Sequence, residues 1–499
     1  MSPLLLVLLV LLSLILCVLR RRNRRDDEPP LITGWIPFIG KALEFGRDAH
    51  TFLEEQKKKF GDIFTVHIAG KYMTFVMDPL MYPSIIKHGR QLDFHKLSDS
   101  LAPIVFGYPP IMNRNSPGLH DEVIRSFQLL QGSNLTPLTE SMMGNLMLLF
   151  RQDHLDERPE EEGGWRRGSM YEFCSSVMFE ATFLTIYGKP ALARRHSGMG
   201  ALREDFLRFD TMFPLLIAKV PIRFLRETKA IRDKLIHFFL PHRMSCWSNT
   251  SMFIKRRLEL LDQYKTLRDV DKAAHHFAIL WASVANTVPA TFWAMYHLVS
   301  HPEALEVVRQ EILNILKASG MEFSADREVM LGREQLDKLL FLESSINESL
   351  RLSSASMNMR VAQEDFSLRL DGERSVAIRE GDIIVLYPQS LHMDPEIYEE
   401  PQMFRHDRYV QDGREKTDFY KDGQKLKYYL MPFGSGSSMC PGRHFAINEI
   451  KQFLCVLLLY FDLQLDEGQT RATVDSSRAG LGILPPTEDI RFSYRPRVV

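Results

Sequence analysis

Residues 433–443 read FGSGSSMCPGR and carry more structural information than any other part of the chain. Two glycines stand before Cys440, and glycine lets a backbone turn tightly and come close to another group. After the cysteine, apolar residues three and four apart predict a helix from about Arg443 to Tyr460; they are Ile447, Ile450, Phe453, Leu454 and Leu457. A helix begins with partial positive charge and free N–H groups, which stabilise a thiolate. The loop therefore predicts a cysteine thiolate in a glycine-rich pocket.

A thiolate in such a pocket is a soft metal ligand, and haem iron with an axial thiolate is one use of it. Two other interpretations of Cys440 remain open here: a core cysteine beside a flexible loop, or a nucleophile, which needs a nearby base. No histidine has an obvious claim to be that base. The remaining cysteines are scattered without metal-ligand spacing, so we interpret Cys17, Cys174, Cys246 and Cys455 as small apolar residues.

Four residues of the loop carry a family resemblance. Phe433, Gly436, Cys440 and Gly442 match the Phe-x-x-Gly-x-x-x-Cys-x-Gly haem loop of the cytochrome P450 monooxygenases, which this chain resembles. The resemblance implies haem b as the cofactor, with Cys440 as the axial ligand of the iron. It places Phe433, Gly436, Gly442 and Arg443 around the haem. It also implies electrons from NADPH, supplied through NADPH–cytochrome P450 reductase as a partner.

A second part of the resemblance is the sequence Glu-Ser-Leu-Arg at residues 348–351. Glu348 and Arg351 stand three residues apart on a predicted helix, which alone indicates a solvated ion pair. The resemblance implies a buried structural pair instead. In the family an arginine further along the chain completes the pair, and Arg408 matches it.

A predicted helix through residues 280–289 contains Pro289, which removes the hydrogen bond to the carbonyl of Ala285 and kinks the axis. In the P450 family this helix crosses the haem and usually carries an acid–threonine pair for proton delivery. Here Ala285 and Asn286 replace the acid and the threonine, and Thr287 follows. An amide can hold a water but is a poor proton donor. We therefore expect Asn286 and Thr287 to be catalytic, with Asn286 or its water taking part in oxygen handling.

Two further departures concern the haem. Ser438 occupies the position where many P450s place an arginine or histidine against a haem propionate. The Trp-x-x-x-Arg pattern of an early helix is missing near residues 118–130. We expect other basic groups, which the sequence does not identify, to hold the propionates.

The asparagine narrows the choice of branch within the family, because sterol 7α-hydroxylases and prostacyclin synthase share it. Residues 173–176 and 281–287 resemble oxysterol 7α-hydroxylase, whereas residues 352–356 and 477–486 resemble cholesterol 7α-hydroxylase. The resemblance implies 7α-hydroxylation of an oxysterol or cholesterol, in bile acid or oxysterol metabolism. Two alternatives remain: a haem-thiolate isomerase that rearranges an endoperoxide without a reductase, and a non-enzymatic haem or sterol sensor.

Three segments are expected to line the substrate site: the kinked helix, the segment after the Glu-x-x-Arg helix, and a turn near the C-terminus. Their side chains are mostly small or apolar, as a flat, rigid sterol requires. The residues concerned are Ala282, Ala285, Asn286, Ser356, Met357 and Leu481.

The N-terminus begins with 19 uncharged, mostly apolar residues, about the length of a membrane-spanning helix, and five arginines follow within residues 20–25. A cleaved signal peptide has its charge before the apolar run, so this order favours a retained signal anchor. The basic cluster should stay in the cytosol. We predict an anchor over residues 1–19, a basic, proline-rich hinge over 20–40 and a haem-thiolate catalytic domain over 41–499. The protein would then be single-pass in the endoplasmic reticulum membrane, in contact with lipid and facing the cytosol.

The 499 residues include 62 basic and 63 acidic side chains, which argues against a nucleic-acid partner. The apolar pattern is mostly helical from about 120 to 350, with a β-hairpin at 61–78 and a second β-rich patch at 366–386. Residues 156–168 look like a surface loop, and residues 394–432 like a packed irregular meander. The predicted class is mainly α with minor β (α+β), with the P450 fold and an N-terminal transmembrane anchor.

Five basic side chains precede the cysteine loop: Arg414, Lys416, Lys421, Lys425 and Lys427. They are either a solvated loop or a docking face for an acidic electron donor.

Overall fold

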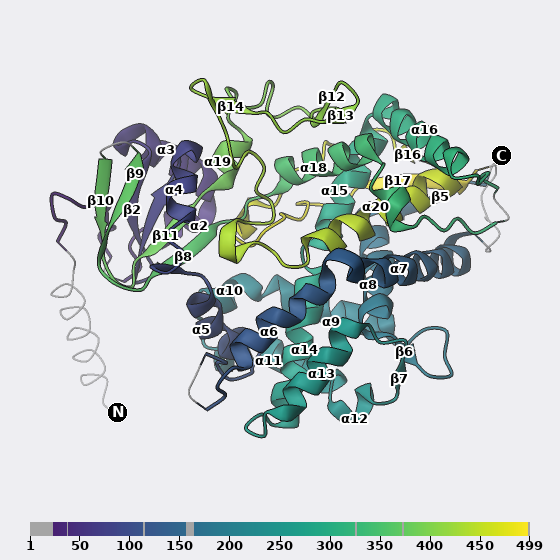
Figure 1. Cartoon of the computed structure of the whole chain (residues 1–499), viewed down its shortest axis with the longest axis horizontal. Coiled ribbons are helices and arrows are strands. Elements are labelled where there is room, and N and C mark those ends of the chain that lie inside the picture. The colour runs from purple at the N-terminus through teal and green to yellow at the C-terminus, as the bar shows by residue number, and fades with distance from the viewer. Residues whose placement is uncertain are drawn as a thin grey trace.

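The computed structural model describes residues 23–36, 38–112, 115–155, 164–324, 327–371 and 374–497. Helices dominate and sheets contribute less, so the predicted mainly α class with minor β is confirmed. The predicted anchor over residues 1–19 lies outside the described residues. In Figure 1 the largest sheet lies at one end of the molecule, and most of the helices lie beyond it.

The helices have the following bounds: α2 Ala42–Arg47, α3 Ala49–Phe60, α4 Tyr82–Ile86, α5 His95–Val105, α6 Leu119–Ser126, α7 Leu135–Phe150, α8 Met170–Tyr187, α9 Met199–Thr211, α10 Phe213–Ile217, α11 Arg226–Phe238, α12 Pro241–Met244, α13 Met252–Gln263, α14 Asp269–Val284, α15 Thr287–Ser300, α16 Pro302–Ala318, α17 Arg333–Leu336, α18 Leu340–Ser353, α19 Pro388–His392 and α20 Arg443–Tyr460. One short helix matters below, η8 Ser476–Arg478.

The largest sheet has six strands in the order β1-β2-β3-β11-β8-β4. Its strands are β1 Leu31–Ile32, β2 Ile63–Ile68, β3 Lys71–Val76, β4 Leu92–Asp93, β8 Asn358–Ala362 and β11 Ile383–Leu386. The antiparallel pair β2 and β3 is the predicted hairpin, and β11 runs parallel to β3. The β-rich patch also forms, as β11 and the antiparallel pair β9 (Phe366–Asp371) and β10 (Arg374–Ile378).

Part of the predicted hinge is held against this sheet. The carbonyl of Pro30 accepts a hydrogen bond from the N–H of Thr65 at 2.8 Å, and β1 pairs with β2. The buried carboxylate of Glu28 pairs with Arg379 at 2.5 Å. From Glu28 onward, therefore, the described part of this segment packs as the first element of the folded domain.

The predicted surface loop over 156–168 needs a correction. Residues 156–163 lie outside the described residues, but Arg166–Ser169 form strand β5. This strand pairs with β17 (Arg491–Pro496), which in turn pairs with β16 (Phe461–Leu465). The partner strand lies more than 300 residues away in the chain, and a local pattern of charge and glycine cannot reveal such a pairing.

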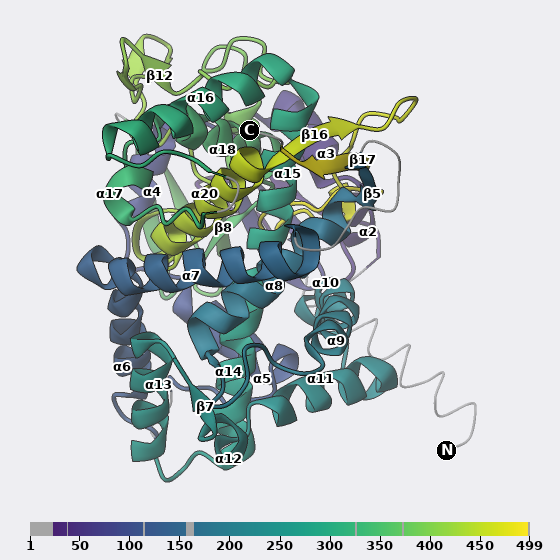
Figure 2. The ribbon, with the colours of Figure 1, turned by 90° about the vertical axis from the view of Figure 1, so that its right-hand side faces the viewer.

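The helical core surrounds α15, α8 and α20. Helix α7 packs against α8 and α20, and α15 packs against α8, α18 and α20 (Figure 2). Both α8 and α15 are buried around nearly their whole circumference, so their apolar residues show little one-sided pattern. The predicted helix from Arg443 to Tyr460 forms with those bounds as α20.

The predicted kinked helix is present as α14 and α15, with a break at Ala285 and Asn286. Pro289 is the third residue of α15 and has no N–H to donate to the carbonyl of Ala285. The run Asp269–Ser300 is also the one stretch of the described chain that is long and apolar enough to span a membrane. Most of it is buried, as expected for a core helix.

The predicted meander over 394–432 is irregular apart from two short hairpins. They are formed by β12 Val410–Gln411 with β13 Arg414–Glu415, and by β14 Tyr420–Lys421 with β15 Gln424–Lys425. The remaining strands, β6 Lys189–Pro190 and β7 Trp247–Ser248, pair with each other.

Candidate active site

The loop before Cys440 is built on glycine. Gly434 and Gly436 have φ angles of 77° and 59°, which favour glycine. A Cβ on Gly436 would lie 2.7 Å from Cγ2 of Ile86, so a side chain there would also collide. The N–H of Cys440 donates to the carbonyl of Phe433 at 2.8 Å and closes the loop. The predicted tight loop forms, with the cysteine just before α20.

The start of α20 favours a thiolate at Cys440. Burial raises the pKa of the Cys440 thiol above its ordinary value, while the backbone N–H groups of Gly442 and Arg443 and the charge of Arg443 oppose that rise. The same N–H groups and charge would stabilise a thiolate bound to a metal. Among the described residues no group of three or more His, Cys, Asp or Glu side chains could hold a metal ion. A single thiolate would be enough to hold haem, because the ring itself would supply nitrogen ligands to the iron.

Arg360 reaches this loop from strand β8 and was missed by the sequence analysis. Its Nη2 donates to the carbonyl of Ser435 at 2.8 Å and to the hydroxyl of Ser438 at 3.1 Å. Its Nη1 is buried and has no hydrogen-bond partner among the described residues, and neither has Nδ2 of Asn358 on the same strand. A buried guanidinium with an unused donor fits a carboxylate, as a haem propionate would supply. Arg360 is thus a candidate for the basic group that holds a haem propionate. The uncharged Ser438 cannot serve as that group.

The sequence does contain a signal for Arg360. In a strand, alternate residues share one face. Asn358, Arg360 and Ala362 are the buried positions of β8, and an arginine at the middle of a buried face requires a partner. The strand itself was not recognised, because its buried face carries an amide and a guanidinium between two apolar stretches.

Glu348 brings the two predicted structural arginines together. Arg351 donates to its carboxylate through Nε and Nη2, both at 2.8 Å, and Arg408 donates through Nε at 2.7 Å. All three side chains are nearly inaccessible. Two guanidinium groups therefore neutralise one carboxylate in the interior, and this contact joins α18 to the meander.

Asn286 lies at the helix break and faces the C-terminal turn. Its Oδ1 accepts a hydrogen bond from the N–H of Ile483 at 2.9 Å. The turn approaches so closely that a Cβ on Gly482 would collide with Oδ1, and Gly482 has a φ of 112°. Nδ2 of Asn286 has no hydrogen-bond partner among the described residues. The NH2 group of the amide therefore has both of its donors left to offer to a bound molecule.

Thr287 has a buried partner that the sequence analysis did not foresee. Its hydroxyl faces the carboxyl of Glu449 on α20, which accepts a hydrogen bond from Oγ1 of Thr182 at 2.8 Å. Burial raises the pKa of Glu449 to about 8. The Thr287 hydroxyl, which the sequence predicts to be catalytic, is thus directed to a protonated acid inside the core.

The predicted substrate segments come together around the helix break. The N–H of Ala355 donates to the carbonyl of Gly482 at 2.9 Å, and the N–H of Gly480 donates to the carbonyl of Ala355 at 2.7 Å. The segment that contains Ser356 and Met357 therefore lies against the turn that contains Leu481. The predicted substrate residues Ala282, Ala285, Asn286, Ser356, Met357 and Leu481 all keep some exposed surface in this otherwise buried region.

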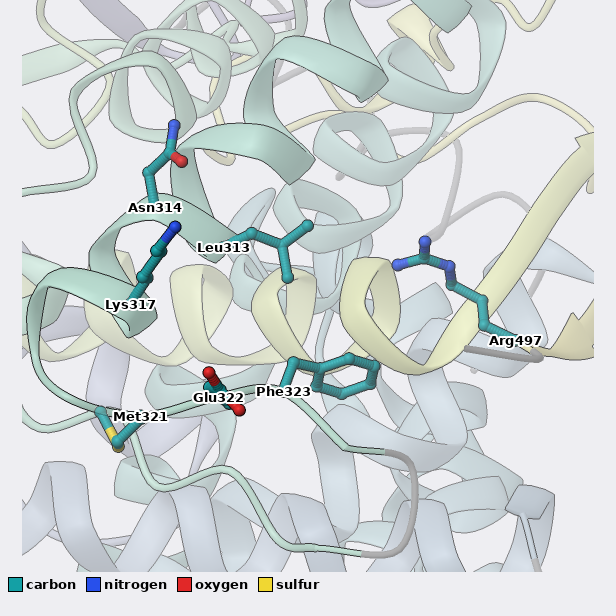
Figure 3. Close-up of a pocket in the computed structure, with 7 residues that line it drawn as sticks. All are labelled: Leu313, Asn314, Lys317, Met321, Glu322, Phe323 and Arg497. Carbon is teal, nitrogen blue, oxygen red and sulfur yellow. The ribbon is translucent and has the colours of Figure 1, made fainter.

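A separate pocket of about 270 Å³ lies between α16 and the C-terminal end of the described chain (Figure 3). It is lined by Leu313, Asn314, Lys317, Met321, Glu322, Phe323 and Arg497. None of the predicted site residues lines it, so it is not part of the candidate active site.

Comparisons with known proteins agree with this geometry. The family model described as Cytochrome P450 matches residues 29–492. The chain is 41% identical to "Cytochrome P450 7B1" of Mus musculus, over 94% of this chain and 91% of that protein. It is 41% identical to "Cholesterol 7-alpha-monooxygenase" of Cricetulus griseus, over 94% and 93%. It is 40% identical to "25-hydroxycholesterol 7-alpha-hydroxylase" of Rattus norvegicus, over 84% and 99%.

The match to the family model covers nearly all of the folded domain, and the relatives align over almost their whole length. Haem with a thiolate-ligated iron is the cofactor of that family, and NADPH supplies its electrons through a redox partner. This chain belongs to the cytochrome P450 family.

Proposed function

We propose that this protein is a haem-thiolate monooxygenase that hydroxylates a sterol, and that the reaction is 7α-hydroxylation of an oxysterol or cholesterol. One observation carries the proposal: relatives at 40–41% identity, aligned over most of both chains, bear names that state this reaction. The small or apolar residues that meet at the helix break support it, because a rigid apolar ring system needs such walls. This places the reaction in bile acid or oxysterol metabolism. The relatives support neither the isomerase nor the sensor.

Different residues of this chain would bind the iron, a propionate and a water molecule around the cofactor. Cys440 would hold the haem iron, and Arg360 with its unused Nη1 would hold a propionate. Bound haem supplies the activation of dioxygen with electrons delivered one at a time. Asn286 can hold a water through Nδ2 while Oδ1 fixes the amide against the C-terminal turn. Because an amide does not readily give up a proton, bound water must complete the proton path in this arrangement.

The electron donor in this proposal is NADPH–cytochrome P450 reductase, and the basic segment before the cysteine loop is a weak candidate for its docking face. Lys421 pairs with Asp394 at 2.6 Å and Lys425 pairs with Asp418. These pairs neutralise part of the charge that would attract an acidic partner. The proposal also includes the single-pass anchor over residues 1–19 in the endoplasmic reticulum membrane, with lipid contact and a cytosolic catalytic domain.

Reconstitution with the reductase tests the proposed function. We expect NADPH-dependent conversion of 25-hydroxycholesterol or cholesterol to a 7α-hydroxylated product, measured by mass spectrometry. Cys440→Ser should abolish both turnover and the red-shifted Soret band of the reduced carbonyl complex. Cys246→Ser changes an exposed cysteine and should alter neither. Endoperoxide rearrangement without NADPH would favour the isomerase instead, and sterol binding without any turnover would favour the sensor.

A further inference from the structure

Asp210 joins three elements that are far apart in the sequence. It lies in the last turn of α9, and its side chain is 16% exposed. Oδ1 accepts a hydrogen bond from Nε1 of Trp281 on α14 at 2.8 Å. Oδ2 accepts from Nη2 of Arg478 in η8 at 2.7 Å, and the backbone carbonyl of Asp210 accepts from Nη1 of the same arginine at 3.0 Å. A single residue thus binds a helix and a turn at once.

Both partners of Asp210 lie next to predicted walls of the substrate site in the sequence. Trp281 directly precedes Ala282 on α14, and Arg478 lies three residues before Leu481. The turn that follows Arg478 is also the one that Asn286 contacts. Asp210 therefore ties α9 to two walls on which sterol contacts are expected.

A small cavity lies on the inner side of this contact. It has a volume of about 10 Å³, and Asp210 and Ala285 both line it beside the helix break. Its other walls are mainly apolar: Tyr171, Ser175, Phe179, Phe206, Leu207, Val284 and Val288. A cavity of this size holds at most one water. The carboxylate of Asp210 therefore lies at the edge of this cavity, next to the break between α14 and α15, and holds α9 against α14.

Aromatic packing continues the contact into the next helix. The ring of Phe213, the first residue of α10, stacks on Trp281 with centroids 4.0 Å apart and an interplanar angle of 10°. Phe106 lies against the same indole, with centroids 5.7 Å apart. Trp281 is thus held by a hydrogen bond on its edge and by rings around it.

Because the carboxylate of Asp210 is buried, its hydrogen bonds to Trp281 and Arg478 depend on each other. Burial raises the pKa of Asp210, and Arg478 and Trp281 oppose that rise by charge and hydrogen bonding. A buried carboxylate that loses its partners must move into water or bind a proton. If α9 moves away from the walls, both hydrogen bonds therefore break together and the carboxylate becomes hydrated.

We propose that Asp210 is a positioning residue that holds α9 against the two walls of the substrate cavity, so that losing this contact loosens the walls and speeds the exchange of a bulky ligand. The role of the cavity rests on the proposed function; the contact itself does not. Asp210 touches no reacting atom, and it acts through Trp281 and Arg478. The ligand class is a rigid apolar molecule held between these walls.

The test compares two asparagine variants on the same helix. Asp210→Asn keeps an acceptor for Trp281 but removes the charge that holds Arg478. Asp205→Asn is the matched control, because Asp205 is also a buried α9 carboxylate but pairs with Lys234 of α11 instead of Trp281 or Arg478. Arg478→Met breaks the same contact from the other side and serves if Asp210→Asn does not fold.

The first measurement is the rate at which 4-phenylimidazole binds to and leaves the haem iron, followed by its spectral shift. This probe does not depend on sterol turnover. We expect Asp210→Asn and Arg478→Met to exchange it about ten-fold faster than wild type, the factor for losing one charge-assisted hydrogen bond. Asp205→Asn should match wild type. Equal exchange rates in Asp210→Asn and Asp205→Asn would overturn the proposal.

The second measurement is the fraction of NADPH that yields hydroxylated sterol. A loosened cavity admits water and misplaces the substrate, so this fraction should fall in Asp210→Asn and stay unchanged in Asp205→Asn. Faster imidazole exchange without any sterol turnover, even in wild type, would support the positioning role of Asp210 and refute the sterol function. Normal wild-type sterol turnover with unchanged exchange in Asp210→Asn would refute the positioning role alone.

Discussion

Arg360 offers the clearest test at the scale of a single residue. It is 2% exposed, and the only hydrogen bonds of its side chain among the described residues are those with the cysteine loop. We predict that Arg360→Met lowers the haem content per protein several-fold, because a propionate would lose its charged partner. Haem content is measured from the Soret absorbance relative to protein. Arg360→Lys should recover part of it by restoring the charge.

Arg414→Met is the control for this prediction, because Arg414 is an exposed arginine in a short hairpin. It should bind haem as wild type does. Full haem content in Arg360→Met would show that another group holds the propionates.

Glu449 predicts a pH dependence of stability. Its pKa is raised from 4.5 to about 8 in the folded protein, so the folded state keeps the proton that the unfolded chain releases at lower pH. The stability contributed by the protonated form is fully present below about pH 4.5 and is lost as the pH rises toward 8. We expect a loss of about 2 kcal/mol in the free energy of unfolding between about pH 6 and pH 8 from this group.

Glu449→Gln keeps hydrogen-bonding capacity for the two threonines and cannot ionise. Chemical unfolding at both pH values should therefore show a weaker fall for this variant than for wild type. The same fall in both proteins would mean that Glu449 is ionised in the folded state.

At the scale of the element, the break between α14 and α15 depends on the glycine turn opposite. Gly482→Ala places a Cβ against Oδ1 of Asn286, and it also strains a position with a φ of 112°. We expect this variant to displace the Asn286 amide, and to lower the fraction of NADPH that yields product.

Gly468→Ala is the control that separates backbone strain at a positive φ from the collision of a Cβ with Asn286. Gly468 has a φ of 77°, and a Cβ there meets nothing within 4 Å. It should cost roughly 1 kcal/mol of stability from backbone strain alone and leave coupling unchanged. Equal coupling in the two variants would argue that the position of Asn286 does not matter for the reaction.

The elements also show how far the sequence could lead. Helix α20 was predictable to its ends, because an apolar period and a preceding glycine loop are local signals. The kink at Pro289 was predictable for the same reason. Strand β5 was not, because β17 completes it from the other end of the chain. The partners of Asn286 and Thr287 were also hidden, since Ile483 and Glu449 are brought to them by tertiary packing.

At the scale of the whole molecule, Glu348 ties the helical body to the meander that precedes the cysteine loop. Arg408→Met removes one partner of a buried carboxylate, and we expect a loss of about 3 kcal/mol in the free energy of unfolding. Chemical denaturation measures it. Arg405→Met is the control three residues earlier, because its partner Glu399 is exposed and such pairs contribute at most about 1 kcal/mol. Equal losses would mean that the buried network does not stabilise the fold.

At this scale the fold also shows how one cysteine can be enough for the cofactor. A glycine loop, a helix start and a buried arginine converge on Cys440 from three parts of the chain. The helix break brings the walls of the substrate site to the same region, and Asp210 holds α9 against them.

The central claim is that this protein inserts one oxygen atom from dioxygen into a sterol. The most direct test is turnover of 25-hydroxycholesterol under ¹⁸O₂, with NADPH and reductase, followed by mass spectrometry of the product. The account predicts one ¹⁸O atom in a new 7α-hydroxyl group and none after Cys440→Ser. A product without ¹⁸O, or an intact haem-thiolate spectrum with no sterol product at all, would contradict it.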